Sequence, residues 1–551
     1  MISLLHRIYR KIFDKYFKWS DVNFIGYINR KLELRFGKDY DQLDKIDLSF
    51  VSKYYRENSF QSNESIKRVV LVDASHPVSR AVFHVNFIQL CLSSIYKTRV
   101  IGYSTFAEQG IEKIYHSFGV HEFINIYKLF NPVVVLSALF HTVKSFHSRN
   151  HINKFSNLPV MVDGRNIGDH IYDSYLRREL VSSHRKVDLK YLLYVYRGLY
   201  YYFSSKKSFS KLGITDIIVN SKVYTNGILI KACASISDKI NIWQTEPWSY
   251  DRFSLSRTNT KYVNNEIPFD RLYRKYYGDI ISKKFTKKDL NTLFDNTFKK
   301  GISWVEKKYS SENDVFQNYS FDSSKKNVFI MTHAFNDAVR IANNNIFADY
   351  RIWFEETLLT LSKNNNINIF VKPHPAENNY HYKEKSTIIF ERIKSKNSHK
   401  NMFIFEHEIE QEKFFEFTDV IITVCGSIGF EAPCFSVPVI TAARGSYYDA
   451  NTTLNPKTYD QYIDLIKNVH NLKRINKNKV IEAKTVYLFT NLFRYHELGI
   501  SFDSENKDEV ERYLRINKFF SNLDEFNSTK IFSLFSDLEA NNREELINLE
   551  I

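Results

Sequence analysis

The sequence contains few of the residues on which several specialised classes of protein depend. Among its 551 residues there are only 4 cysteines, and Cys91, Cys233, Cys425 and Cys434 lie far apart. This spacing excludes a CxxC zinc site and a disulfide-stabilised scaffold, and it fits small buried side chains in a reducing compartment. Glycine (16) and proline (10) are also scarce, which excludes a collagen-like or low-complexity chain.

Long hydrophobic runs are missing as well. The most apolar stretch, residues 133–140, is much shorter than the roughly 20 residues that cross a bilayer. The first twenty residues contain neither an uninterrupted apolar segment nor a small-residue cleavage site, so we expect a cytoplasmic protein. Their apolar and basic residues recur with helical periodicity. This pattern fits two interpretations: a helix on the inner face of an anionic membrane, or a helix that packs on the protein's own core.

Positive charge dominates the chain, with a formal net charge of +15. Residues 501–551 run against this trend, with twelve acidic and six basic residues. A basic chain of this size can bind nucleic acid, an anionic membrane or anionic small molecules. Because the sequence has no arginine-rich arm and no recognisable nucleic-acid motif, we expect no nucleic acid among its partners.

Short β-branched runs alternate with helical patterns in two parts of the chain, which is typical of βαβ units and a mainly parallel sheet. In the first part we expect strands at 67–74, 98–103, 215–220 and 239–243 and helices at 78–96, 107–118 and 224–236. Residues 250–325 are polar and read as a connection with one helical pattern near 290–308. In the second part we expect strands at 327–332, 367–372, 402–405, 420–424 and 438–442 and helices at 350–363, 409–417 and 428–435.

These patterns predict an α/β fold with two Rossmann-like domains that face a cleft, the first at 61–325 and the second at 326–490. Helical extensions are expected on both sides, a basic one at 1–60 and an acidic one at 491–551. Because parallel sheets bind ligands at the carboxyl ends of their strands, the residues that follow each strand are the candidates for chemistry.

Two motifs follow strands of the second part. In the first, Lys372, His374 and Pro375 form the sequence KPHP, whose prolines restrict the backbone around an imidazole that can donate to a phosphate. The alternative is a turn histidine bonded to a backbone carbonyl. The second motif, CGSIGFEA at 425–432, leads from a strand through a glycine-containing turn into a helix, whose free N–H groups suit a phosphate. Its alternative is a plain strand–helix turn with a surface glutamate.

The second part resembles the GT-B nucleotide-sugar transferases that make bacterial capsules and related surface polysaccharides. The resemblance lies in the order of three features along the chain: a strand followed by KPHP, a strand followed by GSIGFEA, and a strand that begins with PVI. This part is similar to the capsule-synthesis group that includes Kdo transferases using CMP-Kdo, and to bacterial sialyltransferases, whose His-Pro and Ser motifs hold the CMP phosphate. The resemblance implies that His374 and Ser427 bind the donor phosphate and that Glu431 binds the nucleoside. Sialyltransferases usually carry paired Ser/Thr where Cys425 and Gly426 stand here, so the nucleotide stays open.

Further residues of the second part fit the same donor pocket. We expect Gly426 and Gly429 to let the donor approach the backbone, and Arg444 to neutralise phosphate charge. His333 and Asp337 follow the first strand of this part, His333 as a candidate catalytic residue and Asp337 as a substrate contact. The alternative is helix capping by Asn336 or Asp337. GT-B enzymes commonly work without a metal, and no DxD-type pair lies near these motifs. We therefore expect no metal and no cofactor besides the donor.

The first part should supply the acceptor site and the catalytic acid or base. If 167–177 is helical, Asp169, Asp173 and Arg177 share one face, and two neighbouring carboxylates can raise each other's pKa. The alternative is that Asp169 caps the helix while Asp173 pairs with Arg177. Tyr224, after a strand, is a candidate acceptor contact. For two further strand-end residues, His76 and Glu246, a structural role is the preferred interpretation.

Together these features predict a glycosyltransferase that moves a sugar from a nucleotide-activated donor, with CMP-Kdo or a related keto-sugar as the narrower hypothesis, to a growing capsular polysaccharide. The acceptor would be a glycan or glycolipid at the inner membrane face. Three alternatives stay open: a cytidine-linked polyol-phosphate transferase of the teichoic-acid type, a sugar-nucleotide 2-epimerase, and a non-catalytic binding partner of a capsule assembly complex.

Overall fold

The computed structural model describes the greater part of the chain in separate ranges. These are residues 65–74, 79–104, 115–116, 118–126, 131–245, 252–262, 281–300, 319–340, 345–377, 384–396, 401–407, 409–445, 447–497 and 529–543. The expectations for residues 1–60, His76, Glu246 and most of the helix at 107–118 lie outside the described residues.

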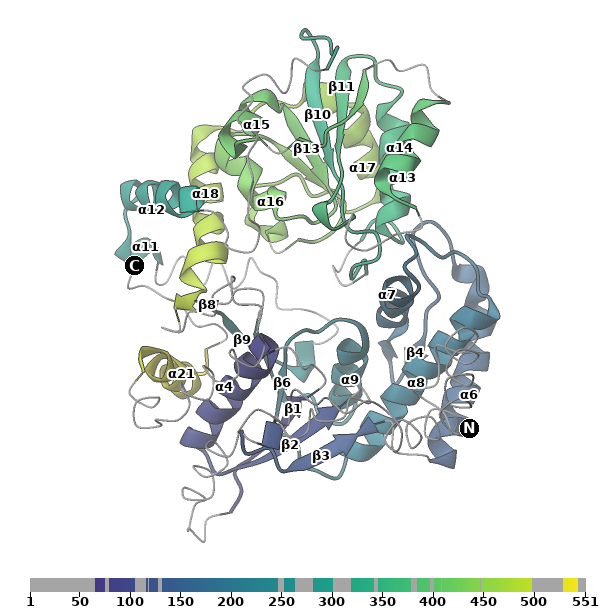
Figure 1. Ribbon diagram of the computed structural model, residues 1–551, viewed down its shortest axis with the longest axis vertical. Coiled ribbons are helices and arrows are strands. Elements are labelled where there is room, and N and C mark those ends of the chain that lie inside the picture. The colour runs from purple at the N-terminus through teal and green to yellow at the C-terminus, as the bar shows by residue number, and fades with distance from the viewer. Residues whose placement is uncertain are drawn as a thin grey trace, which may run out of the picture.

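The first half of the molecule is built on a six-stranded sheet with the order β3-β2-β1-β6-β7-β9 (Figure 1). Its strands are β1 (Arg68–Asp73), β2 (Thr98–Ser104), β3 (Glu122–Asn125), β6 (Asp216–Val219), β7 (Asn241–Thr245) and β9 (Leu255–Asn259). All neighbouring pairs are parallel except β7 and β9, which are antiparallel. The central strands are buried on both faces, as their continuous apolar runs require.

Helices cover this sheet and extend it sideways. α4 (Ser79–Ile95) packs against β1, while α6 (Pro132–His147), α7 (Gly168–Glu179), α8 (Leu189–Phe209) and α9 (Tyr224–Ala234) form a layer beside the sheet (Figure 1). Asn131 and Asp188 cap the first turns of α6 and α8 through their side-chain oxygens, which satisfies backbone N–H groups that a helix start leaves open.

The second half is built on a five-stranded, fully parallel sheet with the order β12-β11-β10-β13-β14. Its strands are β10 (Lys326–Met331), β11 (Ile367–Lys372), β12 (Met402–Ile404), β13 (Val420–Thr423) and β14 (Val439–Thr441). The helices around it are α12 (Lys287–Lys300), α13 (Tyr350–Leu361), α14 (Ser386–Lys394), α15 (Gln411–Phe417), α16 (Ile428–Glu431) with η8 (Ala432–Phe435), and α17 (Tyr459–Lys467). The two sheets, one mainly and one fully parallel, lie at opposite ends of the long axis and confirm the expected α/β fold (Figure 1).

After the second sheet the chain returns to the first half. α18 (Lys477–Leu488) and the π-helical η11 (Phe489–Phe493) lead down to β15 (His496–Glu497), which pairs antiparallel with β8 (Arg252–Phe253) (Figure 1). α21 (Lys530–Ala540) then packs on α4, with the rings of Phe535 and Trp243 stacked at 5.2 Å.

The described part of the acidic segment is therefore integrated into the first half. Glu539 of α21 is buried and accepts hydrogen bonds from Arg68 at 2.7 Å and from Arg257 at 2.6 Å. A buried carboxylate of this kind needs such partners, since burying an unpaired charge is costly. Through these contacts α21 packs on the first half, beside α4 and Trp243.

Several elements differ from the sequence-based expectations. The polar region at 250–325 was expected to be a connection, yet β9 within it forms the edge of the first sheet, because its polar residues need only one covered face. β3, α6 and α8 were not expected either. α8 is rich in tyrosine, a residue with no strong helix preference, and packing between α6 and α9 decides its structure. Among the helices in the described ranges, none combines the length and apolar character that a membrane span needs.

Candidate functional site

Both sheets reverse their strand order beside a central strand, and open α/β sheets bind ligands at such points. In the first half the reversal lies between β1 and β6, where Asp73 ends β1 and Asn220 follows β6. In the second half it lies between β10 and β13, where His333 and Cys425 follow. The polar residues at the second reversal point are therefore the natural centre of a candidate donor site.

His333 brings the two sequence motifs together. Its ring stacks on that of His374 from the KPHP motif, with centroids 5.8 Å apart and an interplanar angle of 18°. Its Nε2 lies 3.9 Å from Cys425 Sγ, at the start of the second motif. A Cβ added to Gly426 would lie 3.4 Å from the same Nε2, in ordinary contact, and 3.0 Å from Thr423 Oγ1, so the Gly426 turn lies directly beside His333. The prediction that both motifs meet at one sheet edge agrees with this geometry.

The two histidines are neutral at neutral pH. Burial lowers the pKa of His333 to about 3, with a smaller contribution from His374. Burial also lowers the pKa of His374, while the charge of Asp337 acts in the opposite direction. Burial raises the pKa of the Cys425 thiol to about 11, so that this group stays protonated. The pair can therefore donate hydrogen bonds from neutral rings, whereas His333 is a weak base.

The turn of the second motif owes its glycines partly to packing. Tyr447 donates a hydrogen bond to the carbonyl of Gly426 at 2.8 Å, and a Cβ on Gly429 would overlap with the Tyr447 ring. Ser427 is exposed at the start of α16, and its hydroxyl does not cap the helix. α16 itself is a single turn that continues as η8. Ser427 is thus accessible to a ligand, while Gly429 serves the packing of Tyr447.

Other residues predicted for the donor site make contacts within the protein. Glu431 is buried and accepts a hydrogen bond from Gln411 Nε2 at 2.8 Å. Lys372 Nζ donates to the carbonyl of His407 at 2.9 Å. The guanidinium of Arg444 lies 5.9 Å from the centre of the Tyr448 ring. Pro375 is exposed and opens a short 3-10 turn, Pro375–Glu377.

The two aspartates of α7 make contacts with the second half. The expected helix and shared face are confirmed, but Asp173 is fully buried and accepts from the backbone N–H of Arg340 at 3.0 and 3.2 Å. Asp169 Oδ1 accepts from Arg340 Nε at 3.0 Å, and the guanidinium also donates to the carbonyl of Phe347 at 3.0 Å. Burial, and then Asp169, raise the pKa of Asp173 well above its usual value. These contacts connect the two halves.

Asp337, Tyr224 and Arg177, the three predicted substrate contacts, do lie together. The Tyr224 hydroxyl donates to Asp337 Oδ1 at 2.6 Å, and Arg177 Nη1 lies 3.9 Å from the same oxygen. Tyr224 adopts a left-handed backbone conformation with φ of 54°, which costs energy in a residue with a side chain and is common at functional sites. Since the charge of Asp337 also reaches His374, this cluster joins the first half to the motif histidines.

Next to this cluster the first half contains a cavity of about 230 Å³. It is bounded by α7, α8 and the segment that leads from β6 into α9. Three arginines and three tyrosines line it, and of the described residues that line it none is acidic. The polar lining consists of Ser174, Arg177, Arg178, Tyr194, Arg197, Tyr201, Ser221, Tyr224, Thr225 and Asn226.

Residues 236–495 match the family of capsule polysaccharide biosynthesis proteins. This match spans both motifs and confirms the resemblance to capsule biosynthesis proteins over that segment, which we call the capsule-family segment. No curated protein sequence matches the chain.

Among solved structures, the chain is similar to two structures of KpsC from Thermosulfurimonas dismutans. The beta Kdo 2,4 transferase shares 15% identity at a TM-score of 0.31, over 50% of this chain and 79% of that one. The beta Kdo 2,7 transferase shares 13% sequence identity at a TM-score of 0.31, and the match covers 62% of this chain and 98% of that one. UDP-GlcNAc 2-epimerase from Neisseria meningitidis shares 11% sequence identity at a TM-score of 0.25, and the match covers 77% of this chain and 99% of that one.

Two buried asparagines were not proposed as ligand contacts from the sequence. Asn336, in the capsule-family segment, is 0% exposed, and Asn220 is 6% exposed. In the described part of the chain, neither amide oxygen nor amide nitrogen of these residues has a hydrogen-bond partner. Because buried polar groups are normally satisfied, both are candidate ligand contacts. Their position after β10 and β6 was the signal that could have identified them.

Arg340 was also missed, and nothing in its local sequence indicates its role. Within the described ranges, no group of three or more histidines, cysteines, aspartates or glutamates is arranged to hold a metal ion.

Proposed function

We propose that the protein is a glycosyltransferase of capsule or related surface polysaccharide biosynthesis. The observation that carries this proposal is the meeting of His374 and the Gly426–Ser427 turn around His333 at the reversal point of the second sheet. The family match of residues 236–495 supports the capsule assignment.

The donor is a nucleotide-activated sugar, with CMP-Kdo or a related keto-sugar as the narrower proposal. The neutral ring of His374 can donate to a phosphate oxygen, and the exposed Ser427 hydroxyl can do the same from the neighbouring turn. Glu431, oriented by Gln411, can accept from the nucleoside. Lys372, Pro375 and Arg444 remain proposed donor contacts, and no cofactor or metal is proposed.

The acceptor is a glycan or glycolipid whose end enters the cavity of the first half, in which apolar atoms form most of the surface and three arginines contribute to the wall. Arg177 and Tyr224 line this cavity and also meet Asp337, which lies close enough to influence the pKa of His374. An acceptor there would be next to the donor. Tyrosine rings and hydroxyl groups suit a sugar, while the guanidinium groups suit an anionic substituent.

In the reaction, an acceptor hydroxyl oxygen forms a bond to the anomeric carbon, and the bond from that carbon to the donor phosphate oxygen breaks. The electron pair leaves with the nucleotide, and the hydroxyl proton passes to a base. Asp337 is a better candidate base than His333, because its side chain is 46% exposed and lies beside the cavity. We assign Asp169 and Asp173 to positioning Arg340 and thereby the loop that carries Asp337.

Turnover experiments with the full chain test this function. Cytidine-, uridine- and guanosine-linked sugars are offered with acidic oligosaccharide acceptors, and the products are analysed by mass spectrometry. We expect an acceptor that gains one sugar and no phosphorus. Gain of phosphorus would identify a polyol-phosphate transferase, and conversion of the donor without acceptor would identify an epimerase. Either result, or transfer at the wild-type rate by His374→Ala, would contradict the proposal.

A further inference from the structure

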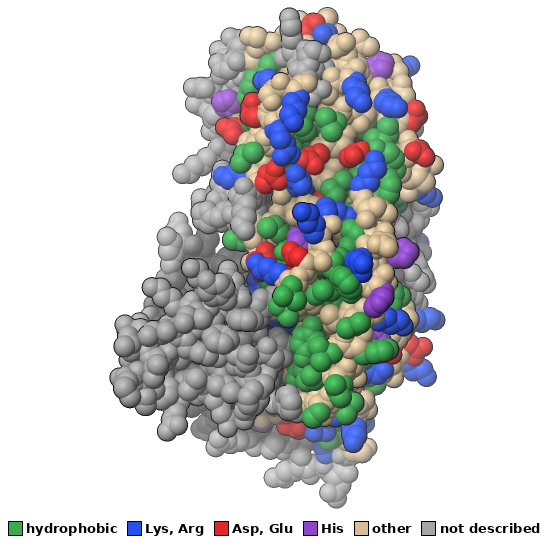
Figure 2. All heavy atoms as spheres, turned by 90° about the vertical axis from the view of Figure 1, so that its right-hand side faces the viewer, with side chains coloured by type: hydrophobic (Ala, Val, Ile, Leu, Met, Phe, Trp, Pro, Cys, Tyr) green, Lys and Arg blue, Asp and Glu red, His purple; other side chains and the backbone are tan. Residues whose placement is uncertain are grey.

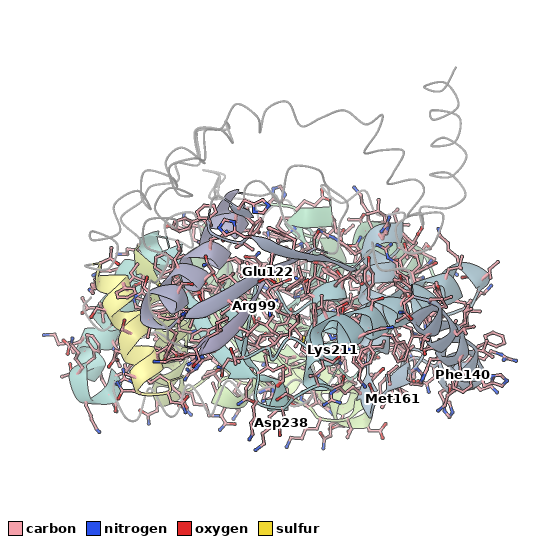
Figure 3. The ribbon with its side chains drawn as sticks, turned by 90° about the horizontal axis from the view of Figure 1, so that it is seen from below. Arg99, Glu122, Phe140, Met161, Lys211 and Asp238 are labelled. Carbon is pink, nitrogen blue, oxygen red and sulfur yellow. The ribbon has the colours of Figure 1, made fainter. Side chains whose placement is uncertain are left out.

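α6, on the outer side of the first half, presents an exposed apolar face. Figure 2 shows hydrophobic side chains gathered on the lower part of the surface that carries this helix, and in Figure 3 Phe140 points away from the protein. Five large apolar side chains of α6 are about half exposed or more: Val133 (67%), Leu136 (66%), Leu139 (47%), Phe140 (66%) and Val143 (58%). We call these five residues the α6 face.

The helix has a separate side for its packing within the protein. Val134, Ala138 and Ser145 are buried, and α6 packs against α8. Residues 133, 136, 140 and 143 recur at intervals of three and four, so they form one stripe on the opposite side. Single exposed apolar residues are ordinary on a protein surface, but a contiguous stripe of this kind marks an interaction site.

The charges around the α6 face indicate what it binds. The helix contains no acidic residue, and exposed basic groups follow its stripe, namely Lys144 and His147 in its last turn and Arg149 just beyond. A helix with bulky apolar residues on one side and cations at its border is the type that lies in the interface of an anionic bilayer.

We propose that the α6 face docks on an anionic membrane surface. The apolar side chains of the α6 face enter the boundary between headgroups and acyl chains, while Lys144 and Arg149 contact lipid phosphates. This surface is distinct from the first twenty residues, for which the sequence alone suggested a membrane contact.

The position of α6 connects the membrane to the acceptor cavity. α8 packs on α6, and Tyr194, Arg197 and Tyr201 of α8 line that cavity. Docking through α6 would therefore hold the cavity one helix layer away from the headgroups, where a lipid-linked glycan begins. The docking itself does not depend on the proposed transfer reaction, because lipid binding is measured without donor or acceptor.

The test is co-sedimentation of the full chain with vesicles of phosphatidylglycerol and phosphatidylcholine, and with vesicles of phosphatidylcholine alone. The double variant Leu136→Ser/Phe140→Ser removes the centre of the α6 face. The matched control is Leu359→Ser/Ile388→Ser on α13 and α14, whose side chains are 42% and 52% exposed. Unchanged circular dichroism and urea midpoints establish that both variants fold.

We expect the α6 variant to lose about tenfold or more in partition to anionic vesicles, since two large apolar side chains no longer enter the bilayer. The control should bind like wild type, and added salt should weaken binding to anionic vesicles. Equal binding by wild type and the α6 variant would overturn the proposal. The proposal would also fail if the wild type does not bind vesicles but forms a dimer in sedimentation velocity, and if Leu136→Ser/Phe140→Ser dissociates that dimer. The α6 face would then bind a second copy of the chain.

Discussion

Replacing Arg340 by alanine should weaken the connection between the two halves more than any comparable surface change. The guanidinium pairs with Asp169 and holds the carbonyl of Phe347, and its loss leaves Asp169 and the fully buried Asp173 close together with one cation fewer beside them. Removing one partner of a buried pair costs about 3–5 kcal/mol, whereas an exposed pair is worth about 1 kcal/mol or less. The side chains of Arg340 and Asp169 are 16% and 29% exposed, so we expect an intermediate loss. We place it at about 2–3 kcal/mol.

Urea unfolding measures this effect through tryptophan fluorescence, since Trp243 and Trp353 are buried reporters, one in each half. The matched control is Arg392→Ala, because Arg392 also pairs with two carboxylates, those of Glu355 and Glu384, but is 41% exposed. We expect the control to change the free energy of unfolding by at most about 1 kcal/mol.

A second variant separates the uncompensated charge from a general loss of packing. Adding Asp169→Asn to Arg340→Ala should restore part of the stability, because one of the two unpaired carboxylates is then neutral. An Arg340→Ala chain that unfolds at the same urea concentration as Arg392→Ala, or a double variant with no recovery, would refute this account of the interface.

Three further predictions follow from the site. The pKa of His333 lies near 3 in the folded chain and near 6.5 in the unfolded chain, so its contribution to stability is present above about pH 6.5 and is lost as the pH falls toward 3. Over that pH range the urea midpoint of His333→Gln should therefore fall less steeply than the midpoint of the wild type. Parallel curves for the two proteins would contradict this prediction. Gly429→Ala should displace the Tyr447 ring and thereby destabilise the chain by about 1–3 kcal/mol. Tyr447→Leu should restore part of this stability in the double variant. An unchanged stability of Gly429→Ala in calorimetry would contradict the close packing of Gly429 against Tyr447. Arg177→Gln should raise the KM for an anionic acceptor while leaving the donor KM unchanged; the same change with a neutral acceptor would point to the Asp337 contact instead.

The second sheet could be predicted closely from the sequence. Its strands are β-branched runs covered on both faces, and β10, β11 and β13 lie within one or two residues of their expected bounds. The meeting of His374 with the Gly426 turn also followed from the sequence, because parallel strands end at a common edge.

The contacts between the halves could not be predicted in this way. The sequence indicated that Asp169 and Asp173 share a helix face, but their partner Arg340 is 171 and 167 positions away, and local patterns hold no information on such pairing. The α6 face was equally hidden, since its residues read as an apolar run and only the packing of α6 on α8 reveals which side is exposed.

Nucleotide binding by wild type and His374→Ala tests the central claim most directly. Thermal unfolding is followed with CMP, CDP, UDP, GDP and their sugar forms at increasing concentration. We expect at least one nucleotide to stabilise the wild type, by about 2.7 kcal/mol at a hundred times its dissociation constant, and CMP if the keto-sugar proposal holds. The His374→Ala chain should unfold at the same temperature without ligand and lose this response. A wild type that no nucleotide stabilises, or a variant that responds equally, would contradict the assignment of the donor site.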